Sequence, residues 1–298
     1  MSAVIETERL TKRYGRARGI DALTLSVAAG EVFGFLGPNG AGKTTTIRTL
    51  LDLLHPTSGR ARLFGLDSRR DSRAIRARLG NLPGEFSYDD RMTGGRLLRL
   101  FAELRGIHTL DRAHALAERF QADLSRPLRE LSRGNRQKIG LIQALFHDPE
   151  LLILDEPTAG LDPLMQEEFL AVVAERRDRG ATVFLSSHDL DEVERVCDRV
   201  AIIRAGRLVA VEDVEDMRGR AYRTVTARFE RPVPPGDFDR LPGVEGVAVD
   251  GTVVRFRVVG DLDAAVKAIA RHPVADVEIT RPTLEELFLA YYDRGVAA

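Results

Sequence analysis

Residues 37–44 read Gly-Pro-Asn-Gly-Ala-Gly-Lys-Thr and match the pattern GxxxxGK[ST] without a mismatch. A short apolar run at 31–36 leads into this stretch, and residues 45–54 read as a helix. Glycines let a backbone wrap around an anion with its N–H groups pointing inward, and the N-terminus of the following helix adds positive potential. The order of strand, loop and helix therefore predicts the phosphate loop of an α/β nucleoside triphosphatase.

The residues of this loop have separate predicted roles. Lys43 reaches the β- and γ-phosphates of ATP, and the hydroxyl of Thr44 is a ligand for Mg²⁺. ATP and Mg²⁺ are therefore the expected cofactors, whereas the alternative is a glycine-rich turn that binds nothing. The predicted nucleotide contacts are Gly37, Pro38, Asn39, Gly40, Ala41, Gly42, Lys43, Thr44 and Thr45.

A second acidic element follows at 151–156, which reads Leu-Leu-Ile-Leu-Asp-Glu. An acidic residue at the end of a buried strand is costly unless a cation or hydrogen bonds compensate it. Asp155 is therefore the expected Mg²⁺ partner, and Glu156 is placed to act on an attacking water as a general base. The alternative is a strand that ends in a helix cap without any catalytic role.

Composition limits the partners and the compartment. The 298 residues carry a formal net charge of -1, so no global field attracts nucleic acid, and none is expected as a partner. Cys197 is the only cysteine, which fits a reducing compartment and excludes a cysteine-rich metal site. No apolar stretch approaches the roughly 18 residues of a membrane-spanning helix, so any membrane function needs a separate membrane protein.

Periodicity predicts the remaining elements of the first 217 residues. Stretches 4–10 and 21–27 alternate like half-buried strands. Solid apolar runs at 151–154, 182–185 and 200–203 are typical of a buried parallel sheet. The expected helices lie at 93–120, as a helical insertion, and at 137–146, 165–177 and 190–196. Seven arginines fall between positions 60 and 78, and we expect most of that segment to be a solvated helix face.

The pattern changes after residues 218–220. Residues 224–229, 252–258 and 276–279 read as strands and 261–270 as a helix. Residues 283–292 read as an amphipathic terminal helix, because Thr283 and Glu286 form a capping-box pattern. These elements predict a separate small α+β domain.

Taken together, residues 3–215 resemble the nucleotide-binding subunit of an ATP-binding cassette (ABC) transporter. The chain is most similar to the exporter-type subunits of the drug- and antibiotic-efflux group, which end in a helix similar to residues 282–288. The resemblance implies an α/β P-loop NTPase core of the ABC type with a helical insertion and N-terminal antiparallel strands, plus a small C-terminal α+β domain. The expected domains are 1–217, with a helical subdomain at about 85–145, and 221–298.

Further site residues follow from the resemblance. Tyr14 stands where the family stacks an aromatic ring on adenine, although a simple packing tyrosine is the alternative. Ser132 and Gly134 occupy the signature motif, which would contact the γ-phosphate of ATP held by the other copy; the alternative is a capped helix without ligand. Asp162 resembles the D-loop aspartate that communicates across the dimer, and His188 resembles the switch histidine that contacts the γ-phosphate.

The sequence departs from the family pattern in two places. Arg133 replaces the second glycine of the signature, and Asn135 replaces its terminal glutamine. The segment 79–85, where the family has its Q-loop, contains no glutamine. Gly84 and Glu85 stand in that place, and Glu85 is a candidate substitute ligand for Mg²⁺.

The resemblance implies an ATP-hydrolysing subunit that works as a homodimer. It would energise a separate integral membrane permease from the cytoplasmic face of the membrane, exporting a drug-like or lipophilic compound. One alternative is a soluble ABC ATPase that acts on ribosomes or DNA. Another is a regulatory module that binds ATP without turnover. For the C-terminal domain, a packing or dimer-stabilising role is favoured over substrate sensing.

Overall fold

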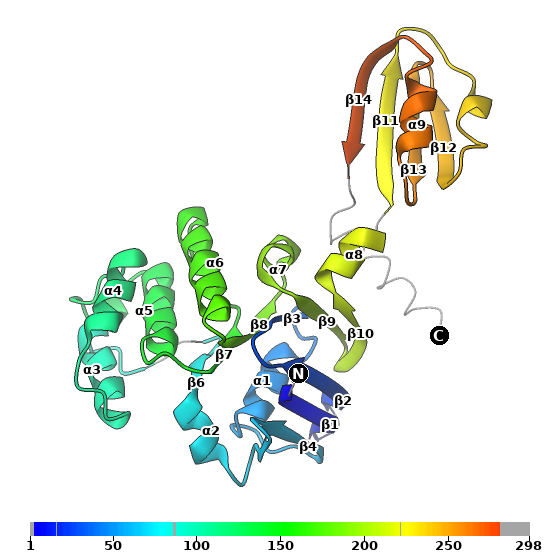
Figure 1. The fold of residues 1–298 in the computed structure, drawn as a ribbon. Coiled ribbons are helices and arrows are strands. Elements are labelled where there is room, and N and C mark those ends of the chain that lie inside the picture. Colours follow the sequence, from blue (N-terminus) through cyan, green and yellow to red (C-terminus); the bar gives the residue numbers. More distant parts are fainter. Residues whose placement is uncertain (1–2, 16, 86–87, 221, 281–298) are drawn as a thin grey trace. The chain divides into compact units, whose positions relative to one another are not determined.

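The computed structural model describes residues 3–15, 17–85, 88–220 and 222–280. The chain divides into two compact units, Met1–Glu212 and Asp213–Ala298 (Figure 1). Each unit has its own hydrophobic core.

A six-stranded sheet of order β10-β9-β3-β8-β7-β6 forms the centre of the first unit. The pairs β6–β7, β7–β8, β8–β3 and β3–β9 are parallel. Every residue of β3, β7 and β8 is buried, as expected for a sheet covered on both faces. The bounds are β3 (Val32–Leu36), β6 (Leu79–Leu82), β7 (Leu151–Asp155), β8 (Thr182–Ser187), β9 (Arg199–Arg204) and β10 (Arg207–Asp213). The predicted parallel sheet is confirmed, but β6 and β10 were not predicted.

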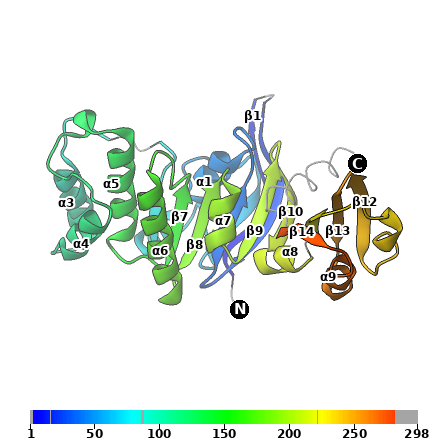
Figure 2. The same ribbon diagram turned by 90° about the horizontal axis from the view of Figure 1, so that it is seen from above.

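Helices cover both faces of this sheet (Figure 2). Phe33 and Phe35 of β3 belong to the same core cluster as Ile47 of helix α1 (Lys43–Leu50). Gly34 points the other way, because a Cβ added there would lie 3.0 Å from Val193 of helix α7 (Leu190–Val196). Successive strand residues face opposite sides, so α1 and α7 cover opposite faces. Helix α6 (Pro163–Asp178) contacts β8.

A second, antiparallel sheet of order β2-β1-β4-β5 packs against α1 through the same core. Its strands are β1 (Ala3–Tyr14), β2 (Ala17–Ala28), β4 (Ser58–Leu63) and β5 (Leu66–Asp67). The predicted N-terminal antiparallel strands are therefore confirmed. Together with the parallel sheet they complete the expected α/β fold of the first unit.

The prediction of a helix over most of residues 60–78 was wrong. Arg60 and Arg62 lie on β4, and only α2 (Ser72–Arg78) is helical. Arg60 pairs with Glu8 on the neighbouring β1, with its Nε 2.7 Å from Oε2. Charged and apolar residues alternate at 60–63 with a period of two, which is the pattern of a strand.

The helical insertion lies between β6 and β7. It contains α3 (Gly94–Leu104), α4 (Asp111–Arg119), the short 3₁₀ helix η1 (Leu128–Glu130) and α5 (Arg133–Leu145). A small core of its own, made by Leu97, Leu128, Leu131 and Ile139, holds α3, η1 and α5 together. The predicted helical insertion is therefore confirmed.

The second unit is a four-stranded antiparallel sheet of order β12-β13-β11-β14. Helix α9 packs on it through Ala265, Ala268 and Ile269. Its elements are α8 (Val214–Arg220), β11 (Arg223–Phe229), η2 (Pro235–Asp237), β12 (Val244–Asp250), β13 (Val253–Val258), α9 (Asp263–Ile269) and β14 (Val274–Thr280). The α+β prediction is confirmed although β12 was not predicted, and the predicted helix at 283–292 lies outside the described residues.

Among the described residues, no helix combines the length and the apolar character that crossing a bilayer demands.

Phe184 tests the central packing of the first unit. Its ring is fully buried and lies 5.9 Å from the ring centroid of Phe33 and 5.4 Å from that of Phe35. We expect Phe184→Ala to lower the free energy of unfolding of this unit by about 3–5 kcal/mol, because it removes a large apolar side chain and leaves a cavity. Urea unfolding followed by circular dichroism measures this change.

The matched control is Leu164→Ala, because the Leu164 side chain is 75% exposed. The control variant should stay within about 0.5 kcal/mol of the parent chain. Equal unfolding midpoints for the two variants would contradict the assigned core.

Candidate functional site

The predicted phosphate loop connects β3 to α1 as expected. Gly40 and Gly42 have φ angles of 78° and 112°, and residues other than glycine rarely adopt this backbone conformation. A Cβ on Gly37 would lie 2.4 Å from the carbonyl oxygen of Ile203, so that position also requires glycine. The backbone N–H of Gly206 donates to the carbonyl oxygen of Ala41 at 2.8 Å. The turn between β9 and β10 therefore helps to hold the loop in shape.

Lys43 carries a buried positive charge at the start of α1. Its side chain is 6% exposed, and its Nζ donates to the carbonyl oxygen of Gly37 at 2.6 Å. The same Nζ lies 3.0 Å from Oε1 of Glu156. A buried ammonium group needs such partners, since an uncompensated charge inside a protein is costly.

The predicted acidic pair lies at the end of β7. Asp155 is 1% exposed, and its Oδ1 accepts a hydrogen bond from the Ser186 hydroxyl at 2.6 Å. Glu156 has a φ of 51°, an uncommon backbone conformation for this residue type. Its N–H donates to Oγ of Ser186 at 3.1 Å, which holds that turn. The sharp change of direction separates two adjacent carboxylates, so that one stays buried and the other faces Lys43.

His188 joins this group from the end of β8. Its Nδ1 lies 2.6 Å from Oε2 of Glu156, while 60% of its side chain is exposed. The Glu156 carboxylate is therefore held between Lys43 and His188. All three residues follow neighbouring parallel strands, and the edge where such strands end is where α/β proteins bind ligands.

The segment that replaces the Q-loop approaches Asp155 closely. A Cβ on Gly84 would lie 2.8 Å from Oδ2 of Asp155, so glycine lets this backbone pass beside the carboxylate. A glutamine at position 84 would displace the carboxylate or the loop. The next residue, Glu85, is exposed.

Tyr14 lies beside the phosphate loop. A Cβ on Gly19 would be 2.9 Å from Cε2 of Tyr14 and 3.1 Å from Cγ2 of Thr45, so both side chains flank Gly19. The ring is 46% exposed, and Nζ of Lys12 lies 5.6 Å from its centroid. The tyrosine ring is accessible at the edge of the loop rather than packed in a core.

The signature residues open helix α5. Ser132 is the N-cap, and its Oγ accepts from the N–H of Asn135 at 3.2 Å. The side-chain amide of Asn135 bonds in turn to the backbone of Asp123. Gly134 lies against the carbonyl oxygen of Gly160, 2.6 Å from where its Cβ would be. Among the residues that the structure describes, Ser132 has no hydrogen bond to the phosphate loop of its own chain.

Asp162 caps the next helix. Its Oδ1 accepts from the N–H of Met165 at 3.1 Å, which is ordinary N-cap geometry for α6. The carboxylate is exposed at the end of the loop that contains Gly160. This observed contact is structural, and its role toward a nucleotide stays a prediction.

Sequence reasoning missed two polar residues behind the site. Nε2 of Gln137 donates to the carbonyl oxygens of Glu156 and Pro157 at 3.0 and 2.9 Å. Glu192, on α7, accepts hydrogen bonds from Thr158 and Ser187. Both residues are buried, and a polar residue at a buried helical position is the signal that could have found them.

Comparison with known proteins identifies relatives of this arrangement. Residues 20–159 match the family model described as ABC transporter. The bacitracin transport ATP-binding protein BcrA of Bacillus licheniformis is 40% identical over 212 residues, covering 70% of this chain and 69% of BcrA. The daunorubicin resistance ATP-binding protein DrrA3 of Streptomyces coeruleorubidus is 35% identical, covering 96% of this chain and 94% of DrrA3.

A solved structure described as the ATP-binding subunit of an ABC transporter has the same fold. It superposes with a TM-score of 0.67 at 30% identity and covers 72% of this chain and 92% of that chain.

Proposed function

We propose that this chain, which belongs to the ABC transporter family, binds and hydrolyses ATP to energise a separate integral membrane permease. The observation that carries the proposal is the Glu156 carboxylate, held between Lys43 and His188 beside the phosphate loop. The proposal includes a division into an ATP-binding domain at 1–217 and an accessory domain at 221–298.

The proposed reaction uses each of these groups in turn. ATP enters the phosphate loop, where backbone N–H groups and Lys43 bind its phosphates and Tyr14 stacks on its adenine. Lys43 then interacts with phosphate oxygens in place of Glu156. The freed Glu156 accepts a proton from the attacking water, and His188 contacts the γ-phosphate. Binding of the substrate therefore prepares the base.

Mg²⁺ fits the oxygen ligands next to this loop. Asp155 offers a buried carboxylate whose Oδ2 faces Gly84, and Thr44 offers a hydroxyl that makes no hydrogen bond within the described residues. Carboxylate and hydroxyl oxygens with phosphate oxygens are the ligands that Mg²⁺ prefers. Thr44 and Asp155 would hold the ion, with Glu85 as a third candidate ligand. When bound, Mg²⁺ neutralises the charge that develops on the phosphates.

Two adjacent substitutions test the cation site. Gly84→Ala places a methyl group against Oδ2 of Asp155, and we expect it to weaken the Mg²⁺-dependent part of ATP affinity by about 10-fold or more. Glu85→Ala should weaken it as well if the carboxylate is a ligand. Isothermal titration with ATP, in Mg²⁺ and in chelator, separates this effect from phosphate-loop binding.

Gly236→Ala is the matched control, because no atom lies within 4 Å of a Cβ at that position. Unchanged Mg²⁺ dependence in Gly84→Ala would overturn the assignment of Asp155. Unchanged Mg²⁺ dependence in Glu85→Ala would remove only Glu85 from the site.

The site is proposed to be completed by a second copy of the chain. Ser132 is exposed at the N-terminus of α5, and that helix has no acidic residue in its first turn. Such a helix end attracts an anion. Among the described residues, neither Ser132 nor Gly134 has a hydrogen bond to the phosphate loop of its own chain. We therefore assign them to the γ-phosphate of ATP held by the partner copy. Asp162 belongs to the same dimer interface in this proposal.

Glu156→Gln tests both the base and the dimer. The amide cannot accept the proton, so we expect ATP turnover to fall by about 10²–10⁴-fold while ATP still binds. The unhydrolysed ATP should then hold two copies together, which light scattering after size exclusion detects as an ATP-dependent dimer. Glu167→Gln, which alters a carboxylate on the exposed side of α6, is the control and should leave turnover unchanged. A Glu156→Gln variant with normal turnover would contradict the role of Glu156.

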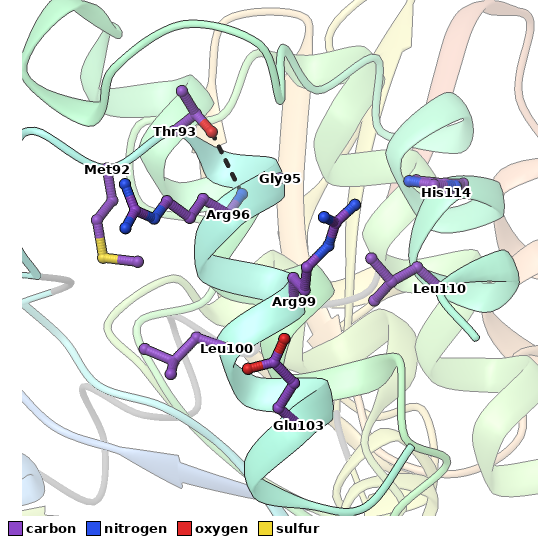
Figure 3. A pocket seen from close by; sticks show the side chains of 9 residues that line it. All are labelled: Met92, Thr93, Gly95, Arg96, Arg99, Leu100, Glu103, Leu110 and His114. Atoms are coloured by element: carbon purple, nitrogen blue, oxygen red, sulfur yellow. Dashed lines mark hydrogen bonds between the residues drawn. The ribbon is translucent and has the colours of Figure 1, made fainter. Parts of the chain in front are cut away.

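The permease is proposed to dock on the helical insertion. A groove of about 810 Å³ lies along α3 and the start of α4 (Figure 3). Arg96 and Arg99 line it beside Leu100, which is 40% exposed. Neither arginine forms an ion pair with any residue that the structure describes. An amphipathic permease segment with aliphatic and acidic side chains fits these properties.

Charge reversal tests this docking surface. We expect Arg96→Glu combined with Arg99→Glu to reduce co-purification with a co-expressed permease subunit by about 10-fold or more, since like charges would then face each other. ATP affinity should not change. Arg70→Glu combined with Arg73→Glu reverses two exposed arginines outside the groove and serves as the control. Equal recovery of the complex from both double variants would place the interface elsewhere.

The cargo is proposed from the relatives. BcrA is named for bacitracin transport and DrrA3 for daunorubicin resistance, which supports export of a drug-like or lipophilic compound. The second unit is proposed to stabilise the dimer. Deleting residues from 221 onward should then weaken dimerisation while leaving ATP binding intact.

A further inference from the structure

Glu192 joins the two loops that carry Glu156 and His188. It lies in the first turn of α7 and is 7% exposed. Its Oε2 accepts from Oγ of Ser187 at 2.7 Å and from Oγ1 of Thr158 at 3.1 Å. Thr158 comes two residues after Glu156, and Ser187 comes directly before His188. One carboxyl oxygen therefore connects both loops.

Burial of this carboxyl group carries a desolvation cost. Its Oε1 is buried and has no hydrogen-bond partner among the described residues. Burial raises the pKa of Glu192 to about 7; the hydrogen bonds from Ser187 and Thr158 oppose the rise, and the nearby Asp189 and Glu156 charges add to it. An apolar side chain of similar size would fill the same space without the desolvation cost. Packing of α7 alone does not account for a glutamate here.

The two loops that Glu192 connects carry both partners of the His188–Glu156 contact. The contact between the histidine ring and the glutamate carboxylate is 2.6 Å long. Each partner is carried by a separate loop, one after β7 and one after β8. Ser187 also accepts from the N–H of Asp189 at 2.9 Å, so its hydroxyl fixes the turn that aims the histidine. Ser186 also links the ends of the two strands, since its Oγ accepts from the N–H of Glu156 and donates to Oδ1 of Asp155. Apart from these bonds and the His188–Glu156 contact itself, Glu192 makes the remaining side-chain hydrogen bonds between the two loops among the described residues.

We propose that Glu192 is a positioning residue for ATP hydrolysis, which fixes the loop of Glu156 relative to the loop of His188. The inference rests on the proposed roles of those two residues. Glu192 has no described hydrogen bond or ion pair to the phosphate loop, so it acts through Thr158 and Ser187. Its effect therefore falls on the chemical step rather than on ATP binding.

The test compares two replacements of similar size in the full chain bound to its permease. Glu192→Met keeps the volume but removes the acceptor, and we expect kcat to fall by about 10- to 100-fold, as for a misplacement of about 1 Å. The KM for ATP should stay within about twofold. The thermal midpoint should shift by less than about 3 °C, because an expensive buried carboxyl has been removed. Glu192→Gln keeps an acceptor oxygen for both hydroxyls and should retain most of the parent kcat.

Asp191→Asn, an exposed neighbour on the same helical turn, is the control for charge and should retain the parent kcat. Three results would overturn the proposal: parent kcat in Glu192→Met, equal loss in Glu192→Gln, or a loss of kcat that follows a lower thermal midpoint. If Glu156→Gln abolishes turnover while Glu192→Met does not, only this inference fails. If the parent complex does not hydrolyse ATP, the proposed function fails with it.

Discussion

The buried positive charge of Lys43 is the constraint on which the site depends. An ammonium group with 6% of its side chain exposed must be neutralised, and in this structure a Glu156 oxygen 3.0 Å away does so. The phosphates of ATP carry more negative charge and would occupy the same loop. In the proposed reaction the lysine exchanges one anionic partner for another, and the carboxylate released by this exchange is the proposed base. In this proposal the Lys43–Glu156 ion pair links the binding of ATP to the release of the catalytic base.

The parallel sheet brings the groups of this exchange together. Much of the sheet could be predicted from the sequence. The phosphate loop is a contiguous motif, and the solid apolar runs of β7 and β8 predict two strands, one that ends at Asp155 and one that ends just before His188. Shorter or more polar strands gave no such signal. β6 has only four residues, including a glycine and an asparagine, and no residue of β12 is fully buried. In segment 60–78 the prediction of a helix was wrong, because Arg60 and Arg62 alternate with apolar residues on β4 and this strand pattern covers only a few residues.

The tertiary contacts behind the site were beyond sequence reasoning for a different physical reason. Gly84 passes beside Asp155, and Gln137 holds the backbone after Glu156. Both contacts join segments that are far apart in the sequence. Neither contact can be predicted from the spacing of residues along the sequence. The absence of a glutamine at 79–85 could be read directly, but its explanation required the position of the Asp155 carboxylate. Motifs predicted the reacting groups, whereas the structure showed which residues hold them in place.

The backbone at Glu156 also limits how this position can change during evolution. Its φ of 51° suits small or unbranched residues and disfavours valine, isoleucine and threonine, whose branched Cβ atoms crowd the neighbouring carbonyl groups. A lineage that abandoned turnover would therefore reach glutamine, aspartate, asparagine or glycine here more readily than a β-branched residue. Non-hydrolysing relatives of this chain should carry such replacements. The backbone turn at this position would then be retained after ATP hydrolysis had been lost.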